Sequence, residues 1–175
     1  FDLPENSVVL VEWPDRAAGF LPADRIDVAL TLAPKLKLEF RHARVTGYGR
    51  LGPRVDRMAA VRRFIAENGY SEALRARIKG DASTRSYERL VLGERHVVLM
   101  NSPRQPDGPP VRDGKPYSAI AHLAETVVPF VGMATALRAR GLSAPQVHHA
   151  ELDQGLLILE DLGDMPVVSG EPPVP

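Results

Sequence analysis

The fold is decided by the stretch Tyr87-Glu88-Arg89-Leu90-Val91-Leu92-Gly93-Glu94-Arg95-His96-Val97-Val98-Leu99-Met100. Its residues 87–92 and 96–100 are short runs rich in apolar side chains, and the turn Gly93-Glu94-Arg95 separates them. This pattern predicts two antiparallel strands joined as a hairpin. A further strand is expected just before them, at residues 77–80.

A second hairpin is expected farther along the chain. Residues 147–152 and 156–160 are strand-like runs on either side of Asp153-Gln154-Gly155. With the three strands before them, they predict an antiparallel sheet of about five strands.

Helical spacing occurs in two places near this sheet. One helix is expected between Pro53 and Gly69, where apolar residues recur at a helical spacing. Pro129 opens a second helix, which ends at Gly141. A short helix is also expected at residues 117–126, after an irregular loop at residues 101–117 that is rich in proline. The fold class is therefore α+β.

The first part of the chain reads as strands and connections. Strands are expected at residues 7–11, 25–32 and 36–40, and the one at 25–32 has the alternation of a half-buried strand. After His42 the apolar residues move from even-numbered to odd-numbered positions, at Ala43 and Val45, which predicts a bulge or a turn there. A change of pattern at residues 47–53 marks a boundary. We expect three parts: residues 1–50, residues 51–164 and a linker at residues 165–175.

Composition excludes several classes of protein. The 175 residues contain 22 Lys plus Arg and 22 Asp plus Glu, so no basic arm for nucleic acid is expected. The chain has no cysteine, which excludes disulfides and thiolate metal sites and fits a reducing compartment, so a cytoplasmic location is expected. No run of apolar residues is long enough to cross a membrane.

The polar stretch between the expected strands 77–80 and 87–92 is a candidate phosphate-binding loop. It consists of Gly80, Asp81, Ala82, Ser83, Thr84 and Arg85. Backbone N–H groups and hydroxyls of such a turn can surround a phosphate. An ordinary polar hairpin turn has the same composition, so local sequence leaves both readings open. Neither a P-loop motif nor a zinc motif occurs in the chain, and no metal site is expected.

Residues 55–164 resemble the aminoglycoside phosphotransferase and choline kinase-like family, most closely the bacterial kinases of cell-wall amino sugars. Four motifs in order carry this resemblance. They are Gly80-Asp81-Ala82-Ser83-Thr84-Arg85-Ser86-Tyr87, His96-Val97-Val98-Leu99-Met100-Asn101-Ser102-Pro103, Gly141-Leu142-Ser143-Ala144-Pro145 and Leu157-Ile158-Leu159-Glu160-Asp161-Leu162-Gly163-Asp164.

The resemblance implies a kinase-like N-lobe that binds ATP with Mg²⁺ and serves a sugar-like phosphoryl acceptor. The loop of residues 80–85 would cover the nucleotide, and the backbone of a hinge formed by Glu160, Asp161 and Leu162 would bond adenine. Glu125 is a candidate for the acidic residue of the lobe's helix. Met100 lies where such kinases usually carry a lysine, and Arg85 is a candidate for the missing positive charge.

The tripeptide Asp161-Leu162-Gly163 is similar to the metal-binding Asp-Phe-Gly of kinases, but we interpret it as the hinge. The catalytic-loop pattern HxDxxxxN, which precedes that metal aspartate, does not occur in the 175 residues. No catalytic residue is therefore expected in this chain. We expect it to end before the catalytic lobe and to be inactive alone.

Residues 1–50 resemble the C-terminal end of the TsaE family, P-loop ATPases that assist threonylcarbamoyl modification of adenosine in tRNA. The motifs are Val8-Val9-Leu10-Val11-Glu12-Trp13-Pro14, Leu21-Pro22-Ala23-Asp24-Arg25-Ile26-Asp27-Val28 and Ala43-Arg44-Val45-Thr46-Gly47-Tyr48-Gly49. By this resemblance the part is the β-rich end of an α/β domain, and Glu12 and Trp13 lie near a nucleotide and metal site. A structural role for Trp13, as the anchor of a strand end, is an equal alternative.

Together the resemblances predict a piece of a bifunctional protein, an ATP-dependent phosphotransferase fused to a TsaE-like ATPase. Its expected partners are ATP, a sugar-like acceptor and other proteins of the tRNA-modifying machinery. Two alternatives are a non-catalytic interaction module and an accessory factor that binds tRNA. The balanced charge argues against the second of these.

Overall fold

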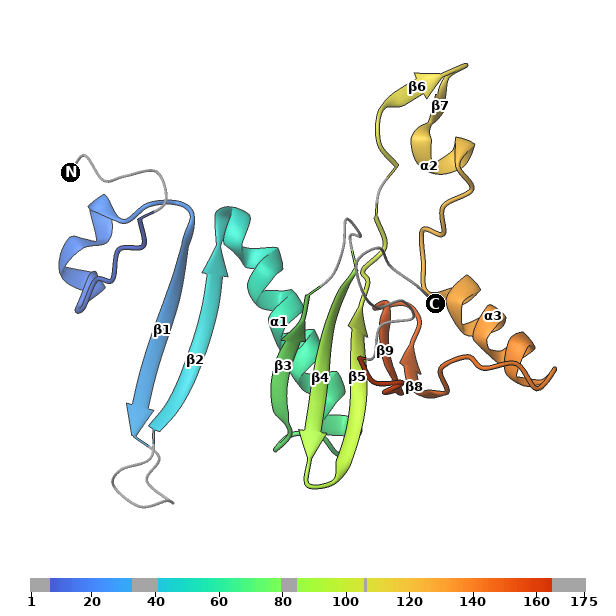
Figure 1. Ribbon diagram of the computed structural model, residues 1–175. Helices are drawn as coiled ribbons and strands as arrows, with labels where there is room; N and C mark the ends of the chain where they lie inside the picture. Colours follow the sequence, from blue (N-terminus) through green and yellow to red (C-terminus); the bar gives the residue numbers. More distant parts are fainter. Residues whose placement is uncertain (1–6, 33–40, 80–84, 106, 165–175) are drawn as a thin grey trace, which may run out of the picture. The chain divides into compact units, whose positions relative to one another are not determined.

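The structure is a computed structural model that describes residues 7–32, 41–79, 85–105 and 107–164. The predicted strand at 36–40, the loop residues 80–84 and the linker at 165–175 lie outside the described residues. The chain divides into two compact units, Phe1–Ala59 and Ala60–Pro175, and the division falls within one helix (Figure 1). Every helix in the described part is too short or too polar to span a lipid bilayer.

The first unit is built on one antiparallel hairpin. A 3₁₀ helix, η1 (Pro14–Phe20), precedes strands β1 (Arg25–Leu32) and β2 (Arg41–Tyr48), and a short 3₁₀ turn, η2 (Gly49–Leu51), follows them. The two strands pair without interruption from Arg25 opposite Tyr48 to Leu32 opposite Arg41. The strand predicted at residues 25–32 is therefore confirmed in position.

Three expectations for this unit are wrong. Residues 7–11 form no strand, because a strand needs a neighbour to bond its backbone groups and this apolar run has none in the described chain. No bulge or turn follows His42, since Ala43 and Val45 lie in regular register with β1. The chain before β1 is not all strand and connection, because it contains η1.

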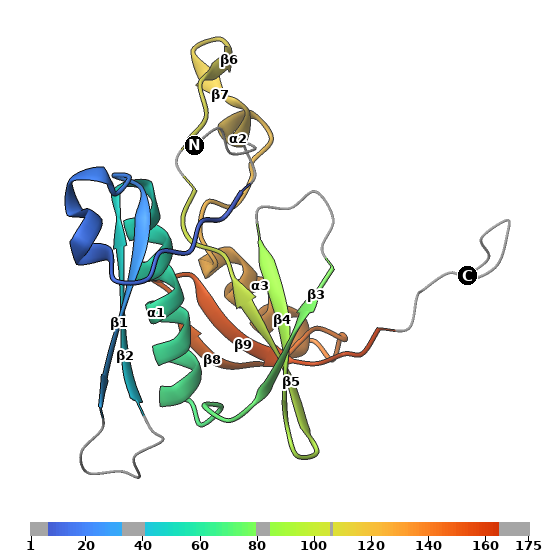
Figure 2. The same cartoon turned by 90° about the vertical axis from the view of Figure 1, so that its left-hand side faces the viewer.

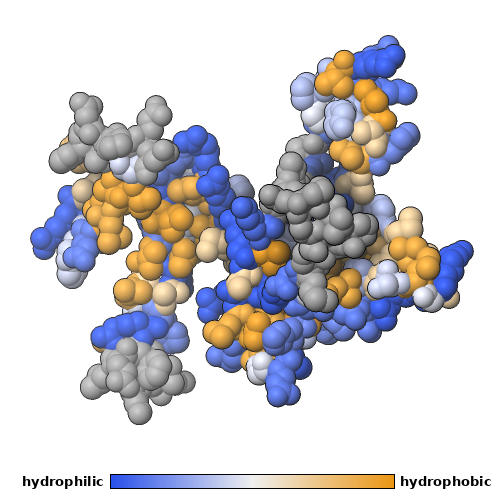
Figure 3. Space-filling view, viewed as in Figure 1, coloured by the Kyte–Doolittle hydropathy of each residue, from blue (hydrophilic) through white to orange (hydrophobic). Residues whose placement is uncertain are grey.

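The hairpin carries an apolar face that this unit does not bury. The even-numbered residues of β1 share that face by strand alternation, and all are about half exposed or more: Ile26, Val28, Leu30 and Leu32. Hydrophobic surface accordingly covers this hairpin in Figure 3. The expected half-burial of β1 is thus not observed.

The second unit contains the predicted five-stranded sheet. Helix α1 (Gly52–Glu67) leads into strands β3 (Leu74–Ile78), β4 (Ser86–Leu92) and β5 (Arg95–Asn101), and strands β8 (Val147–Glu151) and β9 (Leu156–Glu160) follow later. The strand order is β3-β4-β5-β9-β8, and every neighbouring pair is antiparallel (Figure 2). The described chain is therefore an α+β protein with a five-stranded antiparallel sheet.

An excursion between β5 and β9 holds the remaining elements. Strands β6 (Pro110–Arg112) and β7 (Lys115–Pro116) form a small hairpin, followed by α2 (Tyr117–Ile120) and α3 (Val128–Arg138). The region expected as irregular loop therefore includes a small hairpin, and the helix expected at 117–126 is only one turn long. Helix α3 confirms the helix predicted to open at Pro129.

Strand alternation divides the core of the second unit into two clusters. On one sheet face, residues of β4, β5 and β9 pack with α1: Leu90, Val97, Leu99, Leu156 and Ile158 with Val61, Phe64 and Ile65. On the other face, residues of β5 and β9 pack with α3 and the residue before it: Met100, Leu157 and Leu159 with Val127, Phe130 and Val131. Strand β9 is apolar on both faces because helices cover both.

Candidate functional site

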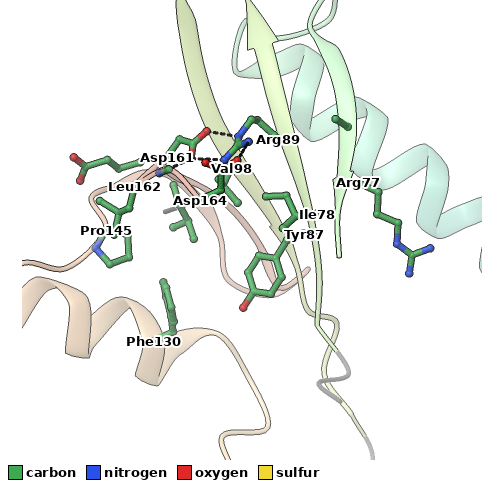
Figure 4. Close-up of a pocket in the computed structure, with 14 residues that line it drawn as sticks. Arg77, Ile78, Tyr87, Arg89, Val98, Phe130, Pro145, Asp161, Leu162 and Asp164 are labelled. Carbon is green, nitrogen blue, oxygen red and sulfur yellow. Dashed lines mark hydrogen bonds and ion pairs between the residues drawn. The ribbon is translucent and has the colours of Figure 1, made fainter. Parts of the chain in front are cut away.

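A groove of about 540 Å³ lies on the α3 side of the sheet in the second unit. This volume is within the range of small-molecule pockets. Side chains from neighbouring strands line it, together with Phe130, Pro145 and segment 160–164, which begins at the last residue of β9 (Figure 4). The groove is therefore built where the end of β9 meets the face of the sheet.

Strand alternation makes the sheet side of this groove apolar except for Arg89. The lining side chains on this face are Ala76 and Ile78 of β3, Tyr87 and Arg89 of β4, Val98 of β5 and Leu159 of β9. The apolar part of this surface suits the flat face of a ring system better than a charged group, because an ion would lose its water there without compensation.

One charged pair lies on this surface, with Arg89 between Ala76 and Val98 in the register of the strands. Arg89 of β4 reaches Asp161 with two parallel bonds, Nε to Oδ2 at 2.5 Å and Nη2 to Oδ1 at 3.1 Å. Its Nη1 lies 3.5 Å from Oδ2 of Asp164. The Asp161 side chain is only 8% exposed and that of Arg89 26%. Two-pronged pairing of this kind is both strong and specific in geometry.

The pair shifts both pKa values away from neutrality. The hydrogen bond from Arg89 holds the pKa of the Asp161 carboxyl below its usual value, with help from the Gly163 N–H and against the desolvation of the carboxylate. The hydrogen bond to Asp161 in turn raises the pKa of Arg89. Both groups are therefore charged at neutral pH, and their charges offset each other.

Two backbone N–H groups of segment 160–164 already donate hydrogen bonds within the protein. The Glu160 N–H donates to the Gln146 carbonyl at 2.8 Å, and the Gly163 N–H donates to Asp161 Oδ1 at 3.0 Å. The N–H groups of Asp161 and Leu162 lie between these two along the chain.

The Glu160 side chain serves the structure around the groove. Its Oε2 accepts from the Gln146 N–H at 3.0 Å and from Arg138 Nη1 at 3.2 Å. Arg138 Nη1 also donates to the Ala144 carbonyl at 2.9 Å. Glu160 thus connects the C-terminal end of α3, the loop before β8 and the end of β9.

The structure brings together only some of the residues singled out from the sequence. Glu160, Asp161 and Leu162 line the groove. Gly80, Asp81, Ala82, Ser83 and Thr84 lie outside the described residues, and half-buried Arg85 comes directly before β4. The roles assigned to these residues stay predictions.

The other predicted residues are not among those that line the groove. Glu125 precedes α3 and pairs with Arg104 at 3.1 Å on the surface. Glu12 and Trp13 belong to the first unit, where the Trp13 side chain is 75% exposed and the residue has φ 56°. Met100 is fully buried among Val127, Leu157 and Leu159.

Sequence reasoning missed Arg89, which lies on the sheet side of the groove and pairs with Asp161. A weak signal was present, because Arg89 interrupts the apolar run of its strand two residues after Tyr87. Its partner lies 72 residues away, so the pairing itself leaves no local pattern.

Comparison with known proteins gives two curated relatives and no matching family model. A protein of Caulobacter vibrioides is 43% identical over 118 residues, which cover 62% of this chain and 32% of the relative. A protein of Pseudomonas aeruginosa is 33% identical over 103 residues, which cover 57% of this chain and 25% of the relative. Both are named N-acetylmuramate/N-acetylglucosamine kinase.

The chain spans about a third or less of the length of these curated relatives. Both relatives carry the name of a kinase, the class of protein that the sequence resemblance implies, and neither name refers to a TsaE-like ATPase.

Proposed function

We propose that this chain is part of an ATP-dependent kinase of amino sugars and that its second unit supplies the base-binding side of the nucleotide pocket. The observation that carries the proposal is the groove between an apolar sheet face and segment 160–164. The two relatives, both named as kinases of N-acetylmuramate and N-acetylglucosamine, support the same class of reaction and a sugar-like acceptor.

The groove supplies two kinds of contact that a nucleotide base needs. Ile78, Val98 and Leu159 offer apolar surface for the flat face of adenine. We propose that the backbone N–H groups of Asp161 and Leu162 supply donors for its edge; those of Glu160 and Gly163 already have acceptors.

The phosphates belong at the other end of the proposed site. The loop of residues 80–85 connects β3 and β4, both of which line the groove. Arg89 is a poor phosphate ligand because its charge is already offset by Asp161 and Asp164. We therefore assign phosphate contact to this loop, with Arg85 at its end.

The described residues do not fit a Mg²⁺ site. They contain no group of three side chains of the types His, Cys, Asp or Glu that could hold a metal ion. The best-placed carboxylate, Asp161, is occupied by Arg89. We propose that Mg²⁺ reaches this protein with the nucleotide and is held by groups outside the described part.

The reaction would transfer the γ-phosphoryl group of ATP to a sugar hydroxyl. Positioning and charge stabilisation dominate such transfers, and an aspartate commonly accepts the hydroxyl proton. The sequence lacks the HxDxxxxN pattern that would carry this aspartate. We therefore propose that the 175-residue chain binds nucleotide without turning it over.

Nucleotide titration followed by backbone NMR tests the proposal. Adenosine and ATP should both shift the amide signals of Asp161 and Leu162, whereas tripolyphosphate alone should shift only signals near Arg85. Absence of shifts with adenosine and ATP would contradict nucleotide binding and favour a non-catalytic interaction module.

We also propose that the first unit is part of a TsaE-like segment fused to the kinase. The support is the sequence pattern around Glu12 and Trp13 and the exposed apolar face of the β1–β2 hairpin, which fits part of a larger sheet. Trp13 is the single tryptophan of the chain, so its fluorescence reports on this unit alone. Proteins of the tRNA threonylcarbamoylation machinery should change that fluorescence, and failure to do so would contradict the assignment.

A further inference from the structure

Arg89 and Asp161 join the middle of the sheet to segment 160–164 at the groove. We propose that Arg89 is a positioning residue of the nucleotide site, which acts through Asp161 to hold the N–H groups of Asp161 and Leu162 toward the base. This inference rests on the function proposed above and names the residue that shapes its base-binding edge.

The geometry of the pair favours such a role over a general surface ion pair. Surface pairs contribute little because both partners stay hydrated and mobile. Here the Asp161 side chain is only 8% exposed and receives two parallel bonds from one guanidinium, so its orientation is set. Figure 4 shows Arg89 reaching from β4 to Asp161 beside Val98, which also lines the groove.

The Asp161 carboxylate also holds the backbone that follows it through a hydrogen bond. The same Oδ1 that accepts from Arg89 Nη2 also accepts from the Gly163 N–H, two residues farther along. Such a bond closes a side-chain turn of the kind that aspartate favours. Gly163 adopts φ 85°, a conformation that side chains rarely allow. The conformation of residues 161–163 therefore depends on where Arg89 holds the carboxylate.

The charge of Arg89 is already offset by two carboxylates, which argues against phosphate binding by this residue. Arg89 contacts Asp161 at 2.5 Å and Asp164 at 3.5 Å, so two carboxylates already face its guanidinium. The neighbouring groove surface is apolar. The part of a nucleotide that fits beside this pair is the uncharged heteroaromatic base, and the phosphates must lie elsewhere.

A matched control pair exists on the opposite sheet face. Arg75 of β3 makes the same two-pronged contact with Glu88 of β4, Nε to Oε2 at 2.7 Å and Nη2 to Oε1 at 3.0 Å. Arg75 lies opposite Leu90 in the register, which places it on the α1 face, and neither partner lines the groove. Removing this pair removes two similar hydrogen bonds and leaves the contacts of segment 160–164 in place.

The experiment compares Arg89→Met with Arg75→Met in the full 175-residue chain. Binding is read as the initial slope of the Leu162 amide shift against adenosine concentration, so that weak binding is sufficient. Arg89→Met should lower this slope at least fivefold and should speed amide hydrogen exchange at residues 161–163. Arg75→Met should leave both unchanged although it also lowers the melting temperature. Arg89→Lys should recover part of the slope, because it keeps the charge and one donor.

The possible outcomes separate the two proposals. If the wild-type chain binds adenosine and Arg89→Met binds equally well, the positioning role is overturned and the proposed function stands. If both variants lose binding in proportion to their melting temperatures, Arg89 is merely structural and the inference is again overturned. If the wild-type chain binds no adenosine, the proposed function fails and the inference fails with it. Should Arg89→Met not fold, Asp161→Asn provides the same comparison with less loss of packing.

Discussion

Arg138 Nη1 donates to Oε2 of Glu160 at 3.2 Å and to the Ala144 carbonyl at 2.9 Å. This single cation therefore joins the last turn of α3 to the end of β9 and to the loop before β8. Because segment 160–164 begins at Glu160, the frame of the groove depends on this contact.

Replacing Arg138 by Met should destabilise the second unit by about 1 kcal/mol. Bonds to charged groups contribute about 1.5–3 kcal/mol when well shielded, and the half-exposed position of this pair reduces that value. Urea unfolding monitored by circular dichroism measures the change. Arg140→Met is the matched control, because within the described residues the Arg140 side chain donates to a carbonyl one turn back, that of Ala136. Equal losses for the two variants would contradict the joining role of Arg138.

The Asp161 carboxyl should make stability depend on pH in the acid range. Its pKa is lowered in the folded chain, so its contribution is present above the unfolded value of about 3.9 and is lost as the pH falls through the folded pKa. Asp161→Asn should therefore be less stable than wild type by about 1–3 kcal/mol near pH 7. The difference should shrink steadily below about pH 4.

Unfolding curves at several pH values test this dependence. Asp164→Asn is the control, because that side chain is 85% exposed and lies farther from Arg89. Its curve should follow that of wild type at every pH. An unchanged gap between wild type and Asp161→Asn down to pH 2 would show that the carboxyl is not the titrating group.

Local sequence patterns were sufficient to predict most strands of the five-stranded sheet. Strands β4, β5, β8 and β9 lie within about two residues of their predicted bounds, because short apolar runs between turn residues specify both the strand and its ends. The strand expected at residues 77–80 instead covers Leu74–Ile78. As an edge strand it carries mostly exposed side chains, so its sequence lacks the alternation of apolar and polar residues that marks a strand buried on one face.

The first unit shows where local patterns fail. Residues 7–11 are as apolar as many strands, but strand formation depends on a neighbour that local sequence does not reveal. The same limit applies to the candidate site. Glu160, Asp161 and Leu162 were found through a motif, whereas Arg89 reaches the groove only through a pairing across 72 residues.

Replacing Gly155 by Ala should destabilise the second unit by about 3 kcal/mol or more, combining the strain of a left-handed residue with a backbone collision. Gly155 has φ 62°, and a Cβ there would collide with the carbonyl oxygen of Ser102. Its own carbonyl accepts from the Ser102 N–H at 2.9 Å, so the two backbones cannot separate without losing that bond. Thermal unfolding measures the loss.

Gly93 supplies the control for this prediction. It has a similar φ of 60°, but nothing lies within 4 Å of the position of its Cβ. Gly93→Ala should therefore cost only about 1–2 kcal/mol, the strain of the backbone conformation alone. Equal costs for the two variants would mean that the close approach of Ser102 and Gly155 adds nothing.

Placing a lysine at Met100, where the kinase resemblance predicts one, should not create a phosphate contact. The Met100 side chain is fully buried between β9 and the residues leading into α3, so an ammonium at this position would be desolvated without a partner. Met100→Lys should lower the free energy of unfolding by several kcal/mol, and ATP should shift no additional amide signals. Met100→Leu keeps the volume and should cost less than about 1.5 kcal/mol. A Met100→Lys chain that is as stable as Met100→Leu and binds ATP more tightly than wild type would show that this strand position faces the phosphates after all.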